Sequence, residues 1–496
     1  MSLHIYNSQS HKKEEFKPLE APQVKMYVCG PTVYDLLHVG NFRGPIFFNL
    51  VRNWLAHLGY QVKFVFNYTD VDDKIINRAQ QEGVAAEEIA EKYIREFQAD
   101  YQRLGLRTPD VIPRVTETMN EIKTMIGQLI ENQKAYVSDH DVLYSIEKFT
   151  EYGKLSGRNT EDLLTGVRID PTEKKRSPLD FALWKAAKEG EPFWESAWGK
   201  GRPGWHIECS AMIKKHLGDT IDIHGGGMDL LFPHHENEVA QSEGANQKPF
   251  VRYWMHNNMI NFGGAKMSKS LGNIRTARSF MDQYTPEVFK FMILSSHYRS
   301  VSDLSPESIE QAIAGLARIY SALALADEVE PTRIAEMVAS KTPVEFYEKL
   351  PAEVKPAYTE AWKKIETALN DDFNTSEVMA VLFEQVRAFN TLNKRGQKPG
   401  AKAIAQAQLL KFVTSQVGRL MNLFLEPAAD YLKNLDDLLL QKKEIKRTDV
   451  DRLVNSRTQA RAEKNFAESD RLREELTKLG ISVSDLPSGS YWEVSK

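Results

Sequence analysis

The chain of 496 residues contains only two cysteines, Cys29 and Cys209. Two cysteines so far apart in the sequence cannot form a disulfide framework, which excludes the small disulfide-rich secreted proteins. Long apolar runs are also absent, because none approaches the roughly 20 residues that a membrane-spanning helix needs. The first twenty residues carry the charged run Lys12–Glu15 and no apolar core, unlike a secretory signal. The sequence therefore predicts a cytoplasmic protein with no membrane partner.

Neither sign of charge dominates, since 64 Lys and Arg against 68 Asp and Glu give a net charge of −4. This balance excludes a protein that coats nucleic acid over its whole surface, although it allows a local basic surface. A hydrophobic content of 42% and a charged content of 27% are typical of a globular protein. Because a single core stops growing near roughly 250 to 300 residues, the length predicts several domains.

The N-terminal half alternates between strand and helix patterns. Strand patterns cover residues 24–29, 62–68 and 220–224, and helix patterns cover residues 40–58, 75–104 and 117–132. This order predicts a right-handed crossover and a parallel sheet, hence an α/β fold. Residues 135–203 break into short segments with scattered Gly, Pro and Trp, which indicates an insertion.

The C-terminal part reads as almost entirely helical after about residue 307. Helix patterns cover residues 308–326, 356–369, 376–392 and 401–423. A last segment, 448–496, is predicted to hold two helices and a short tail with Gly and Pro. Residues 442–473 carry ten Lys and Arg against six Asp and Glu. This excess predicts either a solvated helix face or a basic surface for RNA.

Two short motifs could bind a triphosphate from opposite sides. His38-Val39-Gly40-Asn41 follows a strand pattern and opens a helix pattern, so it offers an imidazole, a carboxamide and helix N-terminal amides. Lys266-Met267-Ser268-Lys269-Ser270 follows the flexible stretch Asn261–Gly264 and offers two ammonium groups. Each motif alone could be a solvated loop, but the pair predicts nucleotide activation.

The two cysteines could belong to a metal site rather than to the core. Cys29 ends a strand pattern, where open α/β sheets place ligands. Cys209 is followed by His234 and Glu238, whose i and i+4 spacing puts both on one helix face. Two thiolates, an imidazole and a carboxylate would make a four-coordinate zinc site. Spacing alone leaves three rival ligands, namely His206, His224 and His235, and buried cysteines without a metal are the alternative.

A glycine run, Gly225–Gly227, follows the strand pattern at 220–224. It could be a plain turn, or it could let the backbone approach a sugar or base closely. In the second case Asp229 would bind the ribose hydroxyls. We therefore count Gly226 and Asp229 among the candidate nucleotide contacts.

Several segments together resemble cysteinyl-tRNA synthetase, a class I aminoacyl-tRNA synthetase family with a Rossmann-type catalytic core. They are Tyr27–Asp35, Asn67–Lys74, Gly201–Ser210, His224–Glu238 and Lys266–Ser270. The resemblance implies that Cys29, Cys209, His234 and Glu238 bind one Zn²⁺ and that Thr69 and Trp205 line the amino-acid pocket. It implies catalytic roles for His38, Asn41, Lys266 and Lys269, and ATP contacts at Gly40, His224, Gly226, Asp229 and Lys269. One departure is Asn41, because many members of the family have a second histidine there.

The resemblance also implies the activity. L-Cysteine and ATP with Mg²⁺ would give cysteinyl-adenylate, and the acyl group would pass to the 3′-terminal adenosine of tRNA(Cys), in a cytoplasmic monomer. The implied segments are residues 1–134 and 204–275 for the Rossmann core, 135–203 for a connective insertion, 276–306 for a stem-contact linker, 307–427 for a helical tRNA-binding bundle and 428–496 for an anticodon-binding module. In that module Arg457, Arg461 and Lys464 would contact phosphates and Trp492 would stack on a base. The alternatives are a ligase that acylates a small amine and a non-catalytic binding paralogue.

Overall fold

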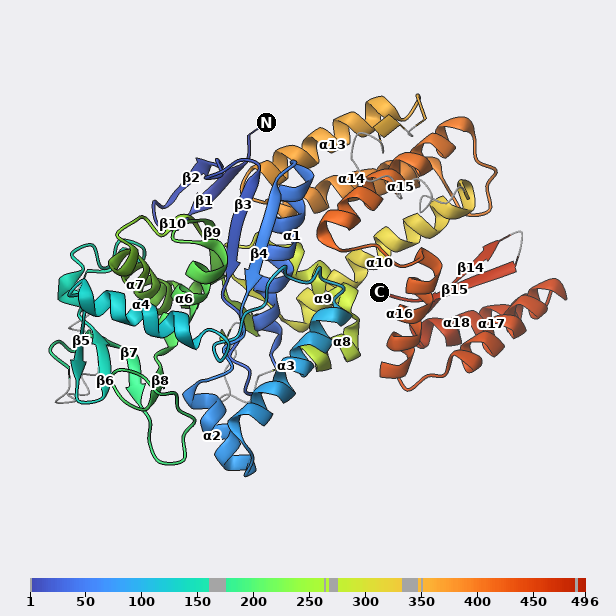
Figure 1. The fold of residues 1–496 in the computed structure, drawn as a ribbon. Coiled ribbons are helices and arrows are strands. Elements are labelled where there is room, and N and C mark those ends of the chain that lie inside the picture. The colour runs from blue at the N-terminus through green and yellow to red at the C-terminus, as the bar shows by residue number, and fades with distance from the viewer. Residues whose placement is uncertain are drawn as a thin grey trace.

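The computed structural model of the chain describes residues 2–159, 175–262, 265–266, 275–331, 347–348, 351–486 and 489–496. Figure 1 gives the course of the chain through these ranges. Of the predicted site residues, Lys269 lies outside the described residues, and so do its neighbours Met267, Ser268 and Ser270. Lys266 is described by its backbone alone.

A parallel sheet of four strands forms the centre of the N-terminal half (Figure 1). Its strands in spatial order are β10 (Val251–Asn257), β9 (Ile221–Gly227), β3 (Gln23–Val28) and β4 (Gln61–Phe66). Helix α1 (Arg43–His57) connects β3 to β4, so the predicted crossover is confirmed. The sequence patterns do not predict β10.

Side chains at alternate positions of β3 enter two separate cores, because successive residues of a strand face opposite sides of a sheet. Met26 and Val28 join the core that contains the apolar face of α1. Tyr27 instead joins the core built by α4 (Met119–Glu131) and α6 (Trp205–Leu217). The sheet is therefore covered on both faces, as a parallel sheet requires.

The predicted helix over residues 75–104 is wrong as a single element. It consists of α2 (Asp73–Glu82) and α3 (Ala86–Arg103). Gly83 separates them with a left-handed φ of 68° and donates its N–H to the carbonyl of Ala79. A glycine can end a helix in this way without a Cβ clash, even where the apolar periodicity continues beyond it.

The predicted insertion contains a second, antiparallel sheet. Its strands are β5 (Ala135–Ser138), β6 (Asp141–Tyr144), β7 (Phe181–Ala186) and β8 (Gly201–Pro203), in that spatial order. Strand β8 ends two residues before α6 begins, so the inserted sheet leads directly into the helix that carries Cys209. An N-terminal hairpin of β1 (His4–Asn7) and β2 (Lys12–Glu15), not predicted from the sequence, lies against β10.

The C-terminal part is helical, as predicted. Its described helices are α8 (Ala277–Tyr284), α9 (Pro286–Leu294), α10 (Pro306–Val329), α13 (Lys355–Asn370), α14 (Thr375–Leu392), α15 (Ala401–Met421), α16 (Ala428–Lys442), α17 (Arg447–Ala462) and α18 (Phe466–Lys478). The patterns do not predict α16. The predicted tail forms a hairpin of β14 (Ile481–Leu486) and β15 (Gly489–Val494).

Among the described helices, α10 is long and apolar enough by composition to cross a membrane. It packs against α14, α15 and α16, and 50% of its most apolar stretch of 18 residues is buried. A helix in the core of a bundle has the same length and composition. The contacts with the bundle therefore account for the apolar surface of α10.

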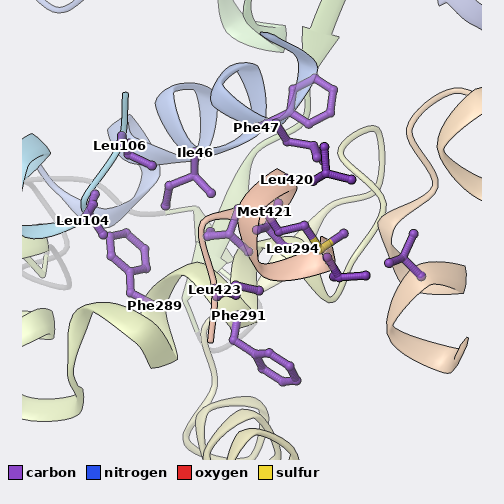
Figure 2. Close-up of a cluster of buried hydrophobic side chains, with 14 of the residues drawn as sticks. Ile46, Phe47, Leu104, Leu106, Phe289, Phe291, Leu294, Leu420, Met421 and Leu423 are labelled. Atoms are coloured by element: carbon purple, nitrogen blue, oxygen red, sulfur yellow. The ribbon is translucent and has the colours of Figure 1, made fainter. Parts of the chain in front are cut away.

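An apolar cluster joins α1 to the helical part of the chain. Figure 2 shows Ile46 and Phe47 of α1 in this cluster with Leu294 of α9 and Leu420 of α15. The side chain of Asn53 on α1 also donates to the carbonyl of Leu420 at 3.0 Å. Because α1 is held by both the sheet and the bundle, the motif that precedes it has a rigid support.

Candidate functional site

The four predicted metal ligands come from three separate parts of the chain that meet at the carboxyl end of the sheet. Cys29 directly follows β3, and its N–H donates to the carbonyl of Gly225 in β9 at 3.2 Å. Cys209 lies on α6. His234 lies in the short helical turn Leu231–His235, and Glu238 follows in α7 (Glu236–Asn246). The structure therefore brings all four predicted ligands together.

The spacing of their donor atoms is that of a coordination sphere. The Sγ of Cys29 is 3.8 Å from the Sγ of Cys209 and 3.6 Å from both His234 Nε2 and Glu238 Oε1. Cys209 Sγ is 3.6 Å from His234 Nε2, and His234 Nε2 is 3.0 Å from Glu238 Oε1. A tetrahedral ion with Zn–S of about 2.3 Å and Zn–N of about 2.0 Å would separate two sulfurs by about 3.8 Å, and sulfur from nitrogen by about 3.5 Å. The donors thus fit an ion of this size.

A second set of donors shares two of these residues. Cys29, His224, His235 and Glu238 also place their donor atoms within 4.8 Å of one another. His224 Nε2, however, is 2.9 Å from Glu238 Oε2, the carboxylate oxygen that faces away from the cysteines. His224 is therefore placed to orient Glu238 rather than to bind the same ion. Two sulfur donors also suit zinc better than one.

His206, the remaining rival, stands behind His234. Its Nδ1 lies 2.9 Å from His234 Nδ1, so it addresses the ring nitrogen that does not face the cysteines. Behind His235 lies His256, whose Nε2 is 2.8 Å from His235 Nδ1. The sequence patterns do not single out His256, because it lies on β10, the strand that they do not predict. The signal available was the stretch before it, Val251–Met255, which is apolar except for Arg252.

The four donors shift one another's protonation. Burial acts to raise the pKa of Glu238, but His224 and His234 outweigh burial and lower it to about 2. Burial acts to lower the pKa of His234, yet Glu238 and Cys209 raise it to about 10. The hydrogen bond from Cys29 lowers the pKa of Cys209 to about 6, whereas burial raises the pKa of Cys29 well above its usual range. A divalent ion bound here would therefore displace protons from His234 and Cys29.

Both predicted residues of the amino-acid pocket lie beside this cluster. Trp205 begins α6 and stacks on the ring of His234, with the ring centroids 4.3 Å apart. It keeps 38% of its surface exposed, and Cys29 is only partly buried, so a ligand could reach the cluster at Cys29. Thr69 is buried, and its Oγ1 donates to Glu208 Oε2 at 3.3 Å. The structure thus brings both residues to the cluster, while their contacts with a substrate stay a prediction.

The His38–Asn41 motif forms the start of a 3-10 turn, Val39–Phe42, ahead of α1. Asn41 is exposed, and its Oδ1 accepts the N–H of His38 at 3.1 Å. The carboxamide oxygen therefore caps the turn, which leaves the amide NH₂ as the group that could reach a phosphate. Gly40 is half-buried between them.

The lysine motif is linked to this turn through the backbone that surrounds it. Lys266 lies on β12 (Ala265–Lys266), which pairs with β11 (Ile260–Phe262). After the motif, the carbonyl of Arg275 accepts the N–H of Val39 at 3.1 Å. The chain at Arg275, beyond the lysines, therefore lies against the His38–Asn41 motif.

The glycines of β9 do not form a plain turn. They end the strand, where a Cβ on Gly226 would lie 2.8 Å from Cε1 of His235. Close packing of His235 thus accounts for Gly226, whose contact with ATP stays a prediction. Asp229 is exposed in the next turn. His224 is fully buried and stacks on Trp254 with ring centroids 4.5 Å apart, so the structure assigns its side chain to Glu238.

In the C-terminal module, the phosphate contact predicted for Arg457 is wrong. Its side chain is buried and donates to both oxygens of Asp485, at 2.7 and 2.9 Å. Arg461 pairs with the same carboxylate but remains half-exposed. Trp492 is partly buried and donates its Nε1–H to Asp451 at 2.9 Å. Charge composition alone cannot separate an internal ion pair from a surface cation.

The chain matches known tRNA synthetases both in sequence and in fold. Residues 15–314 match the family described as the catalytic domain of tRNA synthetases class I (C), and residues 364–425 match the DALR domain. A methionyl-tRNA synthetase of Mycobacterium tuberculosis in complex with methionyl-adenylate superimposes with a TM-score of 0.58 at 13% identity, covering 83% of this chain and 93% of that one. A putative arginyl-tRNA synthetase of Campylobacter jejuni does so with a TM-score of 0.55 at 11% identity, covering 83% and 95%. The fold is that of a class I tRNA synthetase.

Full-length relatives narrow the class to one family. Residues 447–492 match the cysteinyl-tRNA ligase anticodon-binding domain. The cysteine–tRNA ligase of Bdellovibrio bacteriovorus is 56% identical over 494 residues, covering 100% of both chains. That of Trichlorobacter lovleyi is 45% identical over 496 residues, again covering 100% of both. The chain belongs to the cysteine–tRNA ligase family.

Proposed function

We propose that the chain activates L-cysteine with ATP to give cysteinyl-adenylate and transfers the cysteinyl group to the 3′-terminal adenosine of tRNA(Cys). The observation that carries the proposal is the cluster of Cys29, Cys209, His234 and Glu238, whose donor atoms all lie within 4.8 Å of one another. The names of the full-length relatives support the same reaction. We further propose one Zn²⁺ per chain at this cluster, in a cytoplasmic monomer.

The cluster is suited to select cysteine against serine. The two amino acids differ by one atom, and an apolar pocket that senses so small a difference typically discriminates only about 10- to 200-fold. When bound, zinc deprotonates a coordinating thiol and prefers its sulfur to a hydroxyl oxygen. Trp205, which covers one side of His234, would hold the amino acid against the cluster. Thr69 would close the pocket from the side of Glu208.

Activation needs alignment and charge neutralisation rather than a general base. The carboxylate of cysteine is already ionised at neutral pH and attacks the α-phosphorus of ATP. His38, the amide of Gly40 and the NH₂ of Asn41 would hold the phosphates on one side. Lys266 and Lys269, with Mg²⁺, would neutralise the departing pyrophosphate on the other. Asp229, which is exposed beyond β9, would bind the ribose.

The helical part would bind the tRNA. We propose that residues 276–306 and 307–427 contact the acceptor stem and body, that residues 428–496 read the anticodon, and that the insertion at 135–203 belongs to the catalytic part. The matches of residues 364–425 and 447–492 to the DALR and anticodon-binding domains support this division. They also support tRNA rather than a small amine as the acceptor.

Two assays on the purified chain test the proposal. Cysteine-dependent exchange between ATP and pyrophosphate reports adenylate formation, and charging of a tRNA(Cys) transcript reports transfer. We expect both, with serine supporting neither and with one zinc per chain by elemental analysis. Exchange without charging would point to a different acceptor. The absence of cysteine-dependent exchange from zinc-loaded protein would overturn the proposal.

A further inference from the structure

Arg43, the first residue of α1, has a buried guanidinium with an unusual set of partners. Only 1% of the residue is exposed. Its Nη1 donates to the main-chain carbonyls of Asn258 at 2.9 Å and Met259 at 2.7 Å. Its Nη2 donates to the carbonyls of His297 at 3.2 Å and Ser300 at 2.6 Å. Within the described ranges, no carboxylate forms an ion pair with it.

Burying a guanidinium without a carboxylate partner destabilises the fold. Its presence here therefore indicates a role that a neutral side chain could not fill. A buried charge is normally paired, because taking an ion out of water carries a large desolvation cost. Burial lowers the pKa of Arg43 to about 10, so it remains protonated at neutral pH. Its planar fork of donors fixes two separate chain segments relative to α1, which a single ammonium group cannot do.

The first segment leads to the lysine motif. Met259 immediately precedes β11, whose antiparallel partner β12 contains Lys266. The second segment leads to the other neighbour of the same strand. Ser300 is followed by β13 (Ser302–Asp303), which pairs in parallel with β11. Arg43 therefore holds the chain just before β11, the strand that pairs with the strand of Lys266, and the chain just before β13, which pairs with the opposite edge of β11.

The far end of the same segment is tied to the residues just before Arg43. Val39 donates its N–H to the carbonyl of Arg275 at 3.1 Å, and Ala277 donates its N–H to the carbonyl of Leu37 at 2.9 Å. Residues 37–43 thus hold the chain where it enters the lysine segment and where it leaves it. The His38–Asn41 motif lies between these two attachments.

We propose that Arg43 is a positioning residue for ATP, which sets the distance between the His38–Asn41 motif and the strand that carries Lys266. The proposal rests on the proposed function, and it assigns to Arg43 no contact with substrate, because both of its Nη groups are used by main-chain carbonyls. A displacement of about 1 Å in such a site can cost about 100-fold in rate.

Arg52 provides a matched control. It lies on the same helix, is also 1% exposed, and donates to the carbonyls of Thr108 at 2.6 Å and Arg107 at 3.5 Å. It also pairs with Asp110. None of these partners belongs to the phosphate site, so Arg52→Lys removes an equally buried guanidinium without moving the lysine segment.

The test compares Arg43→Lys with Arg52→Lys. For Arg43→Lys we expect kcat of cysteine-dependent pyrophosphate exchange to fall by about 10- to 100-fold and KM for ATP to rise. KM for cysteine, zinc content and single-turnover transfer from preformed cysteinyl-adenylate to tRNA should stay within about twofold of the native chain. For Arg52→Lys we expect a similar drop in Tm with exchange retained.

Equal losses of exchange in the two variants, or an equal rise in KM for cysteine and for ATP, would overturn the role of Arg43. If Arg43→Lys does not fold, Asn258→Ala tests the same attachment, because the carbonyl of Asn258 is one of the acceptors of Arg43. Asn258 Nδ2 donates to the carbonyl of Arg299 at 2.9 Å, and its Oδ1 accepts the N–H of Met259 at 2.8 Å. Its loss should weaken ATP alone, by less than Arg43→Lys, and unchanged ATP kinetics would refute the proposal. Absence of exchange in the native chain would instead refute the proposed function.

Discussion

The cysteine cluster and the phosphate site are built in different ways. In the cluster, Cys209, His234 and Glu238 are each at most 2% exposed. Their outward-facing atoms are held by further side chains, as His224 holds Glu238 and His206 holds His234. The phosphate site instead joins an exposed turn at Asn41 to a separate chain segment. The first site is fixed by contacts between side chains, and the second by hydrogen bonds to main-chain carbonyls, including those from Arg43.

Because the two sites are built differently, substitutions in them should affect the binding of cysteine and of ATP separately. A change within the cluster should affect zinc and cysteine first, because a metal site depends on the position of each donor. A change on the phosphate side should affect ATP first, because charge neutralisation there needs only that two segments stay at the right distance. Variants of either site that alter KM for cysteine and KM for ATP equally would contradict this division.

The largest effect should come from Cys209→Ser. Changes behind a metal ligand alone typically cost about 10- to 100-fold in affinity or activity, so loss of a ligand should cost at least on the order of 10³-fold in exchange. We expect zinc to be lost and KM for cysteine to rise sharply. Elemental analysis and exchange kinetics measure both. Ile213→Val, a buried change on the same helix, is the control, and a Cys209→Ser variant with normal zinc and normal KM would refute the cluster.

Lys269→Ala should come next. Removing one donor to a developing charge typically costs about 100- to 1000-fold in kcat. Here the zinc content and KM for cysteine should remain those of the native chain, in contrast with Cys209→Ser. Lys248→Ala, which removes an exposed lysine paired with Asp219, is the control. A loss of zinc in Lys269→Ala would mean that the two sites are not separate.

The sequence predicts the cluster well because few residues of the chain can bind zinc through sulfur. Only two cysteines are present, and one stands at the end of a strand in a βαβ pattern, where ligands are bound. The resemblance to a known family then separates His234 from its rivals. Spacing could not do so, because His206, His224 and His235 all lie close to the same donors, and only the direction of each ring nitrogen distinguishes a ligand from a supporting side chain.

Other features depend on backbone conformation and on long-range contacts, which the spacing of apolar residues in the sequence does not reveal. The break between α2 and α3 depends on the backbone conformation of Gly83, not on any loss of apolar spacing. Arg457 has the same charge as a surface arginine, and only its pairing with Asp485 through a hairpin places it inside. Arg43 lies two residues after the His38–Asn41 motif, yet nothing in the sequence links it to carbonyls more than 200 residues away.

A smaller effect is expected for His224→Leu. This change keeps the volume roughly constant but removes the group that holds Glu238 Oε2. Zinc affinity, measured by competition with a chelator, should fall by about 10- to 100-fold, while KM for ATP should not change. If KM for ATP rises and zinc affinity is unchanged, the predicted ATP contact of His224 is right and its role behind Glu238 is wrong.

The smallest effect should come from Asn41→His, which introduces the second histidine that the family resemblance implies at this position. The Oδ1 of Asn41 accepts the N–H of His38 at 3.1 Å, and a histidine Nδ1 can accept the same N–H. The neutral ring should therefore keep the turn. The imidazolium carries a proton on both nitrogens and cannot accept this N–H, but its charge-assisted hydrogen bond to a phosphate, roughly twice as strong as a neutral one, should outweigh the loss.

Because an exposed histidine has a pKa of about 6.5, the new ring is cationic below that pH and neutral above it. KM for ATP in Asn41→His should thus fall a few-fold below that of the native chain at pH 6 and match it at pH 8. Asn41→Ala, which removes the cap, should raise KM for ATP at both pH values. Identical behaviour of the histidine and alanine variants would mean that Asn41 contributes its carboxamide directly to the phosphates rather than to the turn.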